Sequence, residues 1–149
     1  MKELNITINF DLDGTLANTY GVEGWLEMLR TEDETPYAIA EPLLRLCSLA
    51  KVLNKLQREG YKHAIISWLS KGGSDEYGER VRQTKLDWLE RHLPSVEWDE
   101  INIVPYGTPK ELFCDSMLDI LFDDEEQNRE NWNGISYDVE DILGVLKDF

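Results

Sequence analysis

The fold of this chain is decided by a short acidic stretch that follows an apolar, β-like run at residues 4–10, namely Phe10-Asp11-Leu12-Asp13-Gly14-Thr15-Leu16. Side chains alternate along an extended backbone, so Asp11 and Asp13 point the same way where the strand ends. Gly14 allows the chain to turn sharply immediately behind them. The stretch therefore predicts two carboxylates side by side at the end of a strand, an arrangement suited to phosphoryl transfer.

The composition indicates a globular protein with a substantial core. The chain has 149 residues, of which 42% are hydrophobic, and it contains five tryptophans, so one domain over residues 1–149 is expected. The chain contains no run of about 18 apolar residues, so no membrane span is expected. Residues 1–5 lack the basic and apolar stretches of a signal peptide. We therefore expect a cytoplasmic protein that does not contact membranes.

Charge and cysteine content narrow the classes of partner. The formal net charge is −15, which repels polyanions and disfavours nucleic acid as a partner. A small phosphate ester stays compatible, because a bound divalent cation reverses the local field. Cys47 and Cys114 lie far apart in apolar contexts, which predicts buried free thiols rather than a disulfide, and no Cys/His cluster indicates zinc.

Beyond the acidic stretch, helical and extended patterns alternate. The patterns predict three helices, over residues 43–59, 75–93 and 139–147, and four further strands, over residues 61–67, 101–104, 117–122 and 134–137. This alternation predicts an α/β fold of three layers, with a five-stranded parallel sheet and helices on both faces. Residues 17–42 are the least regular part, and we expect them to form a short insertion over the site.

In such sheets, ligands bind beyond the carboxyl ends of the strands, and polar residues follow the predicted strands in this chain. The chain resembles the haloacid dehalogenase superfamily of hydrolases over nearly its whole length. The residues that carry the resemblance are, in chain order, Asp11 and Asp13, Ser67, Lys110, Asp123 and Asp124. Haloacid dehalogenases proper lack the second acid, so Asp13 favours phosphoryl transfer. The resemblance implies the spatial strand order fifth, fourth, first, second, third, in a Rossmannoid fold.

The resemblance also implies roles for individual residues. Asp11 is expected to be the nucleophile that forms an aspartyl-phosphate, and Asp13 to act as acid and then as base. Ser67 and the peptide N–H of Trp68 are expected to bind phosphate. Residues 67–71 are similar to a segment of the 5′(3′)-deoxyribonucleotidase branch, which adds Lys71 as a phosphate contact, although a solvated surface lysine explains it equally well.

Mg²⁺ is the cofactor that the resemblance implies, because hard oxygen ligands converge at the strand ends. Asp11, the backbone carbonyl of Asp13 and the carboxylate of Asp124 are the expected ligands. Asp123 is expected to support the metal site from behind without direct coordination.

Two lysines compete for the role of the cation that neutralises the nucleophile and the phosphate. Lys110 follows the third predicted strand, and Lys85 lies in the middle of a predicted helix. By comparison with the deoxyribonucleotidases, Lys110 is expected to be the catalytic, phosphate-binding cation and Lys85 a helix-surface residue.

These expectations lead to a Mg²⁺-dependent phosphatase, a nucleotidase-like phosphoric monoester hydrolase. Its substrate would be a small phosphate ester such as a nucleoside monophosphate. Two alternatives remain open: a phosphatase of polynucleotides or other macromolecules, and a catalytically silent nucleotide-binding domain. The short insertion leaves a further choice between an open site and a homo-oligomer in which a neighbouring subunit completes the pocket.

Overall fold

A parallel sheet of five strands forms the centre of the fold, in the order β3-β2-β1-β4-β5. This computed structural model describes residues 5–149. The strands are β1 (Thr7–Phe10), β2 (Lys62–Trp68), β3 (Glu100–Val104), β4 (Ile120–Phe122) and β5 (Ile135–Tyr137). The predicted strand order and fold class are confirmed. The strand that precedes Asp11 is therefore central, with β2 on one side and β4 on the other.

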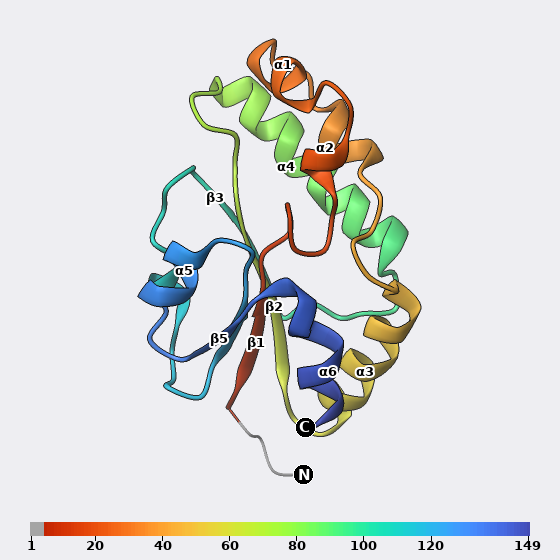
Figure 1. The fold of residues 1–149 in the computed structure, drawn as a ribbon, viewed down its shortest axis with the longest axis vertical. Coiled ribbons are helices and arrows are strands. Elements are labelled where there is room, and N and C mark those ends of the chain that lie inside the picture. The colour runs from red at the N-terminus through yellow and green to blue at the C-terminus, as the bar shows by residue number, and fades with distance from the viewer. Residues whose placement is uncertain (1–4) are drawn as a thin grey trace.

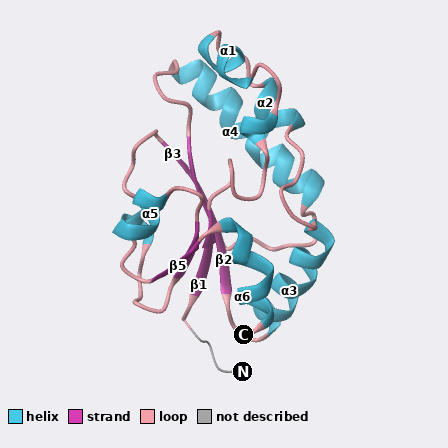
Figure 2. Ribbon diagram, in the orientation of Figure 1, coloured by secondary structure: helices cyan, strands magenta, loops and turns pink. Residues whose placement is uncertain are grey.

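Helices cover both faces of the sheet, which makes the three predicted layers (Figure 2). One face packs through Ile8, Phe10 and Phe122 against apolar side chains of α3, α4 and α6. The other face packs more thinly, with Ile66 and Leu121 against Trp132 and the segment around η2. The helices are η1 (Thr19–Gly21), α1 (Trp25–Arg30), α2 (Thr35–Ile39), α3 (Leu46–Arg58), α4 (Asp75–His92), η2 (Lys110–Phe113), α5 (Glu126–Asn131), η3 (Val139–Asp141) and α6 (Ile142–Lys147).

Most predicted elements are present, with shifted ends. The helix expected over residues 43–59 begins at Leu46, and the last helix is divided into η3 and α6. The helix α5 was not predicted, because its polar sequence shows no apolar stripe. Leu4, the first residue of the predicted first strand, lies outside the described residues.

The prediction of buried thiols is wrong for both cysteines. Both are free, but Cys47 is exposed and Cys114 is only partly buried. Leu49, Leu53 and Leu56 form the face of α3 that packs into the core, and Cys47 lies two positions before Leu49. Residues two apart point to different sides of a helix, so Cys47 faces away from the sheet.

Residues 19–39 form an insertion with three short helices, η1, α1 and α2. In Figure 1 it lies beside the first half of α4, beyond the end of the sheet where β1 stops. Tyr77 of α4 donates from its hydroxyl to the carbonyl of Asp33 (3.0 Å), and the Glu32 carboxylate accepts from the N–H and the hydroxyl of Ser74. These contacts attach the insertion to the N-terminal end of α4.

No helix among the described residues is both long and apolar enough to cross a bilayer.

The core packing makes a stability prediction. Leu53 is fully buried between α3 and the sheet, whereas Leu112 is 71% exposed. We expect Leu53→Ala to lower the free energy of unfolding by about 2–5 kcal/mol, because it leaves a cavity. Leu112→Ala, which removes the same atoms from the surface, should change it by less than about 0.5 kcal/mol. Urea denaturation of both variants measures this, and equal losses would contradict the described core.

Candidate functional site

The acidic stretch folds into a tight loop directly after β1. Asp11 donates its N–H to the carbonyl of Phe122 (2.9 Å), which extends the β1–β4 pairing by one residue. The next residues then wrap around the carbonyl of Leu12, which accepts backbone N–H groups from residues 15, 16 and 17. This loop keeps the carboxylates of Asp11 and Asp13 at the end of the central strand, where both are largely buried.

Gly14 is required by this loop for two reasons. Its φ of +81° lies in the left-handed region that disfavours other residues. A Cβ at Gly14 would also collide with the carboxylate of Asp124, at less than a normal contact distance. The absence of a side chain at residue 14 therefore lets the loop after β1 approach the loop after β4 closely.

Three carboxylates meet at this junction. Asp11, Asp123 and Asp124 each offer an oxygen, and these oxygens lie within 4.8 Å of one another. The Thr15 hydroxyl donates to Asp11 Oδ2 (3.2 Å) and lies 3.4 Å from Asp124 Oδ1. Hard oxygen ligands at this spacing suit a divalent cation such as Mg²⁺ or Ca²⁺.

The two acids after β4 differ in what already binds them. Asp123 is completely buried, and its carboxylate accepts from Lys110 Nζ (2.7 Å), Asn128 Nδ2 (3.2 Å) and the backbone N–H of Glu125 (2.9 Å). Asp124 is more exposed and has far fewer donors around it. The carboxylate of Asp124 is therefore less occupied by protein donors than that of Asp123, and the expected order of the two acids as metal ligands stays a prediction.

Burial and the nearby charge of Asp11 raise the pKa values of the two acids after β4. Burial, then the charge of Asp11 and a hydrogen bond to it, raise the pKa of Asp124. Burial and the charge of Asp11 likewise raise the pKa of Asp123, against the lowering effect of Lys110. A divalent cation would relieve this repulsion, because it favours the ionised form of each ligand.

Lys110 lies at the centre of this cluster. Its ammonium donates to Asp11 Oδ1 (3.0 Å) and to Asp123 Oδ2 (2.7 Å), and the side chain is buried. Burial alone lowers the pKa of Lys110, but the two carboxylates outweigh burial and raise that pKa above its usual range. Lys110 therefore stays charged between the carboxylates of Asp11 and Asp123.

The prediction that Lys85 is a helix-surface residue is wrong. Lys85 is 1% exposed, and its ammonium donates to Asp13 Oδ2, Ser67 Oγ and the carbonyl of Trp68, each at 2.7 Å. It lies on the buried face of α4, four residues after Val81. A lysine within an otherwise apolar stripe was the signal in the sequence that should have identified it.

Asp13 is held from two sides. Lys85 binds one carboxylate oxygen, and the hydroxyl of Thr19 donates to the other (2.6 Å). Thr19 comes from η1 at the start of the insertion and was not identified from the sequence, where nothing distinguishes it from a surface threonine. The pairing leaves Asp13 in a fixed orientation next to Asp11.

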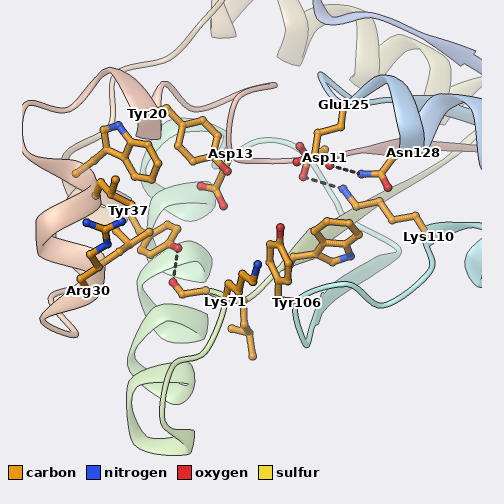
Figure 3. A pocket seen from close by; sticks show the side chains of 16 residues that line it. Asp11, Asp13, Tyr20, Arg30, Tyr37, Lys71, Tyr106, Lys110, Glu125 and Asn128 are labelled. Carbon is orange, nitrogen blue, oxygen red and sulfur yellow. Dashed lines mark hydrogen bonds and ion pairs between the residues drawn. The ribbon is translucent and has the colours of Figure 1, made fainter.

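A cavity of about 570 Å³ opens above these groups. Figure 3 shows that Asp11, Lys110 and Asn128 lie at one end, and that Tyr20 and Tyr37 line the side formed by the insertion. Burial, with a smaller contribution from Asp13, raises the pKa of both tyrosines. Both hydroxyls are therefore neutral at physiological pH, and that of Tyr37 is already hydrogen-bonded to the Ser70 hydroxyl.

Of the remaining residues expected at the site, Trp68 and Lys71 line the cavity, whereas Ser67 lies beneath its surface. Ser67 is buried with its hydroxyl on Lys85. The indole of Trp68 lines the cavity and donates to the carbonyl of Thr108 (2.8 Å). Lys71 also lines the cavity, but on the side away from Asp11 and Lys110, with its ammonium 5.7 Å from the Tyr106 ring centre (Figure 3).

The pair between Lys85 and Asp13 makes a prediction that does not depend on activity. Lys85→Met should lower the free energy of unfolding by about 3 kcal/mol, because it leaves the Asp13 carboxylate without its buried counter-charge. In the double variant Lys85→Met/Asp13→Asn the loss should be clearly smaller than the sum of the two single losses. Urea denaturation gives the four values of this cycle. Additive losses would show that the two charges are not coupled.

The comparisons with known proteins bear on the fold. No family model and no curated protein matches the sequence. Among solved structures, the chain is similar to a D,D-heptose 1,7-bisphosphate phosphatase from Burkholderia thailandensis, with a TM-score of 0.52 and 11% sequence identity over 97% of each chain. At this identity the similarity concerns the fold, and it extends over the whole length of both proteins. The chain thus has the haloacid-dehalogenase-like α/β fold that its acidic stretch predicted.

Proposed function

We propose that this protein is a Mg²⁺-dependent phosphatase that hydrolyses a small phosphate monoester through an aspartyl-phosphate on Asp11. The observation that carries this proposal is the position of Asp11 in the lining of the cavity, where it binds Lys110 and lies beside the acids after β4. Asp13 lies two residues further on and is fixed by Lys85. The solved structure of similar fold is itself a phosphatase of a sugar bisphosphate, which agrees with this class of reaction.

The residues present fit a magnesium ion. Asp11 and Asp124 would hold it through carboxylate oxygens, together with the backbone carbonyl of Asp13. Asp123 is occupied by Lys110 and Asn128 and would keep these groups in place. When bound, the ion offsets the repulsion between the Asp11 carboxylate and the incoming phosphate.

The proposed reaction has two steps. In the first, a carboxylate oxygen of Asp11 bonds to phosphorus, the ester P–O bond breaks, and Asp13 gives its proton to the leaving oxygen. In the second, water attacks the aspartyl-phosphate at phosphorus, Asp13 takes the proton of that water, and inorganic phosphate leaves with Asp11 regenerated. Lys110 lies beside the reacting oxygens in both steps and stabilises their charge.

Ser67 is suited to positioning the phosphate. Its hydroxyl oxygen accepts the hydrogen bond from Lys85, so its own hydrogen is free to donate to a phosphate oxygen. The expected contacts from the N–H of Trp68 and from Ser67 would then lie on the β2 side of the phosphate, opposite the acids after β4.

The walls of the cavity favour a planar organic group. Tyr20 and Trp25 of the insertion lie with their ring centres 4.8 Å apart, and Trp68 and Tyr106 form a second pair at 5.0 Å. Figure 3 shows Tyr20 of the insertion on one side and Tyr106 on the other, and Trp68 also lines the cavity. Stacking on such rings contributes about 1–3 kcal/mol for a nucleobase, so a nucleoside monophosphate is the substrate we propose.

The alternatives receive less support. A polynucleotide substrate would meet a chain of net charge −15, which repels it at long range. A catalytically silent binding domain would not need four acids at this site, Asp11, Asp13, Asp123 and Asp124. Nor would it need two buried lysines, one paired with Asp13 and the other with Asp11 and Asp123. The arrangement of acids and cations therefore favours an enzyme.

The nucleophile can be tested directly. We expect the purified protein with Mg²⁺ to hydrolyse nucleoside monophosphates and simple phosphate esters, and Asp11→Asn to abolish turnover while it leaves ligand binding and the fold intact. Asp148→Asn, which removes an exposed acid at the C-terminus, is the matched control and should keep full activity. Release of inorganic phosphate measures both. Full turnover by Asp11→Asn, or no turnover of any ester by the wild-type protein, would refute the proposal.

The metal ligands can be tested by binding. We expect Asp124→Asn to weaken Mg²⁺ binding more than Asp123→Asn does, and Mg²⁺ to bind more tightly as the pH rises. The sign follows from the raised pKa of Asp124, since a protonated acid must lose its proton before it can coordinate the ion. Calorimetry in buffers of different ionisation enthalpy should show proton release on binding. A greater loss for Asp123→Asn would reverse the assigned order.

A further inference from the structure

Lys85 is a buried cation whose hydrogen-bond donors are all occupied by the protein. An ammonium group carries three N–H donors, and here they bind Asp13 Oδ2, Ser67 Oγ and the carbonyl of Trp68, each at 2.7 Å. The side chain is buried and lies outside the lining of the cavity. Lys85 therefore does not contact a phosphate ester in this arrangement, and any effect that it has on the reaction must pass through the groups that it binds.

The other buried lysine has a different access to the cavity. Lys110 binds two carboxylate oxygens, those of Asp11 and Asp123, and its side chain lines the cavity. Within residues 5–149, its third N–H donor has no hydrogen-bond acceptor, so it is available for a phosphate oxygen. The two lysines therefore differ in what they can do: Lys110 can meet the substrate, whereas Lys85 reaches only protein groups.

Asp13 is the group through which Lys85 can act on the cavity. The terminal torsion of an aspartate side chain is soft, so the carboxylate turns unless donors bind both of its oxygens. Lys85 binds Oδ2, and the hydroxyl of Thr19 binds Oδ1 (2.6 Å). Each carboxylate oxygen offers two acceptor sites, so both oxygens keep one site for a proton. Because Asp13 lines the cavity, it can present that proton to a substrate in a fixed direction.

The two donors to Asp13 come from elements that pack against each other. Thr19 belongs to η1 of the insertion and Lys85 to α4, and the insertion lies beside the first half of α4 (Figure 1). Both side chains are buried, and the Tyr37 ring of the insertion lies 4.9 Å from the Lys85 ammonium. The orientation of the Asp13 carboxyl is therefore set by the packing of the insertion on α4.

We infer that Lys85 is a positioning residue for proton transfer to the leaving group, and that Thr19 assists it from the insertion. The two donors hold the Asp13 carboxyl so that its proton points at the leaving oxygen. That proton moves to the leaving oxygen while Asp11 bonds to phosphorus and the ester P–O bond breaks. The inference rests on the proposed function, because it takes Asp11 as the nucleophile and Asp13 as the acid. It implies that the reaction depends on Lys85 only as far as the leaving group needs a proton.

A matched pair of esters separates positioning from structural support. para-Nitrophenyl phosphate releases a stabilised phenolate that leaves without a proton. para-Nitrobenzyl phosphate has an additional methylene and releases an alkoxide that needs a proton. For Lys85→Met, we expect kcat/KM to fall about 100-fold for the benzyl ester, the typical cost of a misplaced catalytic group, and far less for the phenyl ester. A merely structural role, or a charge effect on phosphate binding, would lower both by the same factor and would overturn the inference.

A second variant tests the same idea without loss of a buried charge. Thr19→Val keeps the shape of the side chain and removes only the donor to Asp13 Oδ1. We expect it to lower kcat/KM for the benzyl ester relative to the phenyl ester by about tenfold, the usual value of a hydrogen bond to a charged group. The matched controls are Thr84→Val, whose hydroxyl binds the carbonyl of Arg80 within α4, and Lys51→Met, an exposed lysine of α3. If Thr19→Val and Thr84→Val gave the same ratio of the two esters, the inference would be wrong.

Binding without turnover separates this inference from the proposed function. Orthovanadate forms five-coordinate adducts that resemble the transition state, with an oxygen in the leaving position, and is compared with orthophosphate by calorimetry in the presence of Mg²⁺. We expect the wild-type protein to bind vanadate more tightly than phosphate, and Lys85→Met and Thr19→Val to lose this preference while they still bind phosphate. Loss of the preference in both variants supports the inference even if neither ester is hydrolysed. Its retention in both overturns the inference even if hydrolysis at Asp11 is found.

Discussion

The pairing of buried carboxylates with two buried lysines is the constraint on which the rest of the site depends. Asp11, Asp13 and Asp123 are withdrawn from water at one end of the sheet, and each lone buried charge costs several kcal/mol. Lys110 lies between the ends of β1 and β4, where it binds Asp11 and Asp123. Lys85 reaches from α4 to Asp13 and to the end of β2. The two ammonium groups therefore join three strands and a helix at the point where the acids converge.

This cluster can form only because the sheet is parallel and β1 is its central strand. Loops that follow parallel strands leave from the same edge, so the loops after β2 and β4 flank the loop after β1. The rings of Phe10, Phe122 and Tyr137 stack across β1, β4 and β5 at 5.3 and 5.6 Å. This packing fixes the relative height of these strand ends, and hence the positions of Asp11 and Asp123, which directly follow two of these rings.

The sequence was informative wherever one short stretch determines a local structure. Residues that follow apolar runs indicated that Asp11 converges with Asp123 and Asp124, whereas the strand order and the proximity of Lys110 to Asp11 were implied by the resemblance to a known family. Contacts between distant elements could not. Thr19 binds Asp13 only because the insertion folds back over the loop after β1, and Asn128 reaches Asp123 from a helix with no apolar pattern. Lysine in a helix usually faces water, but Val81 and Leu89, four residues on either side of Lys85, are buried and place Lys85 on the inner face of α4.

The insertion is attached to the same residues that organise the cluster, which links the shape of the cavity to the position of the acid Asp13. The Tyr37 ring of α2 lies 4.9 Å from the ammonium of Lys85, and its hydroxyl is bound to Ser70. Tyr37 also packs with Tyr77 and Val81 of α4, in a small apolar cluster separate from the main core. Moving the insertion away would expose these apolar side chains and admit water to Lys85. An insertion this short can therefore serve as a fixed wall of the cavity, because its attachment to α4 and the burial of Lys85 favour the same closed arrangement.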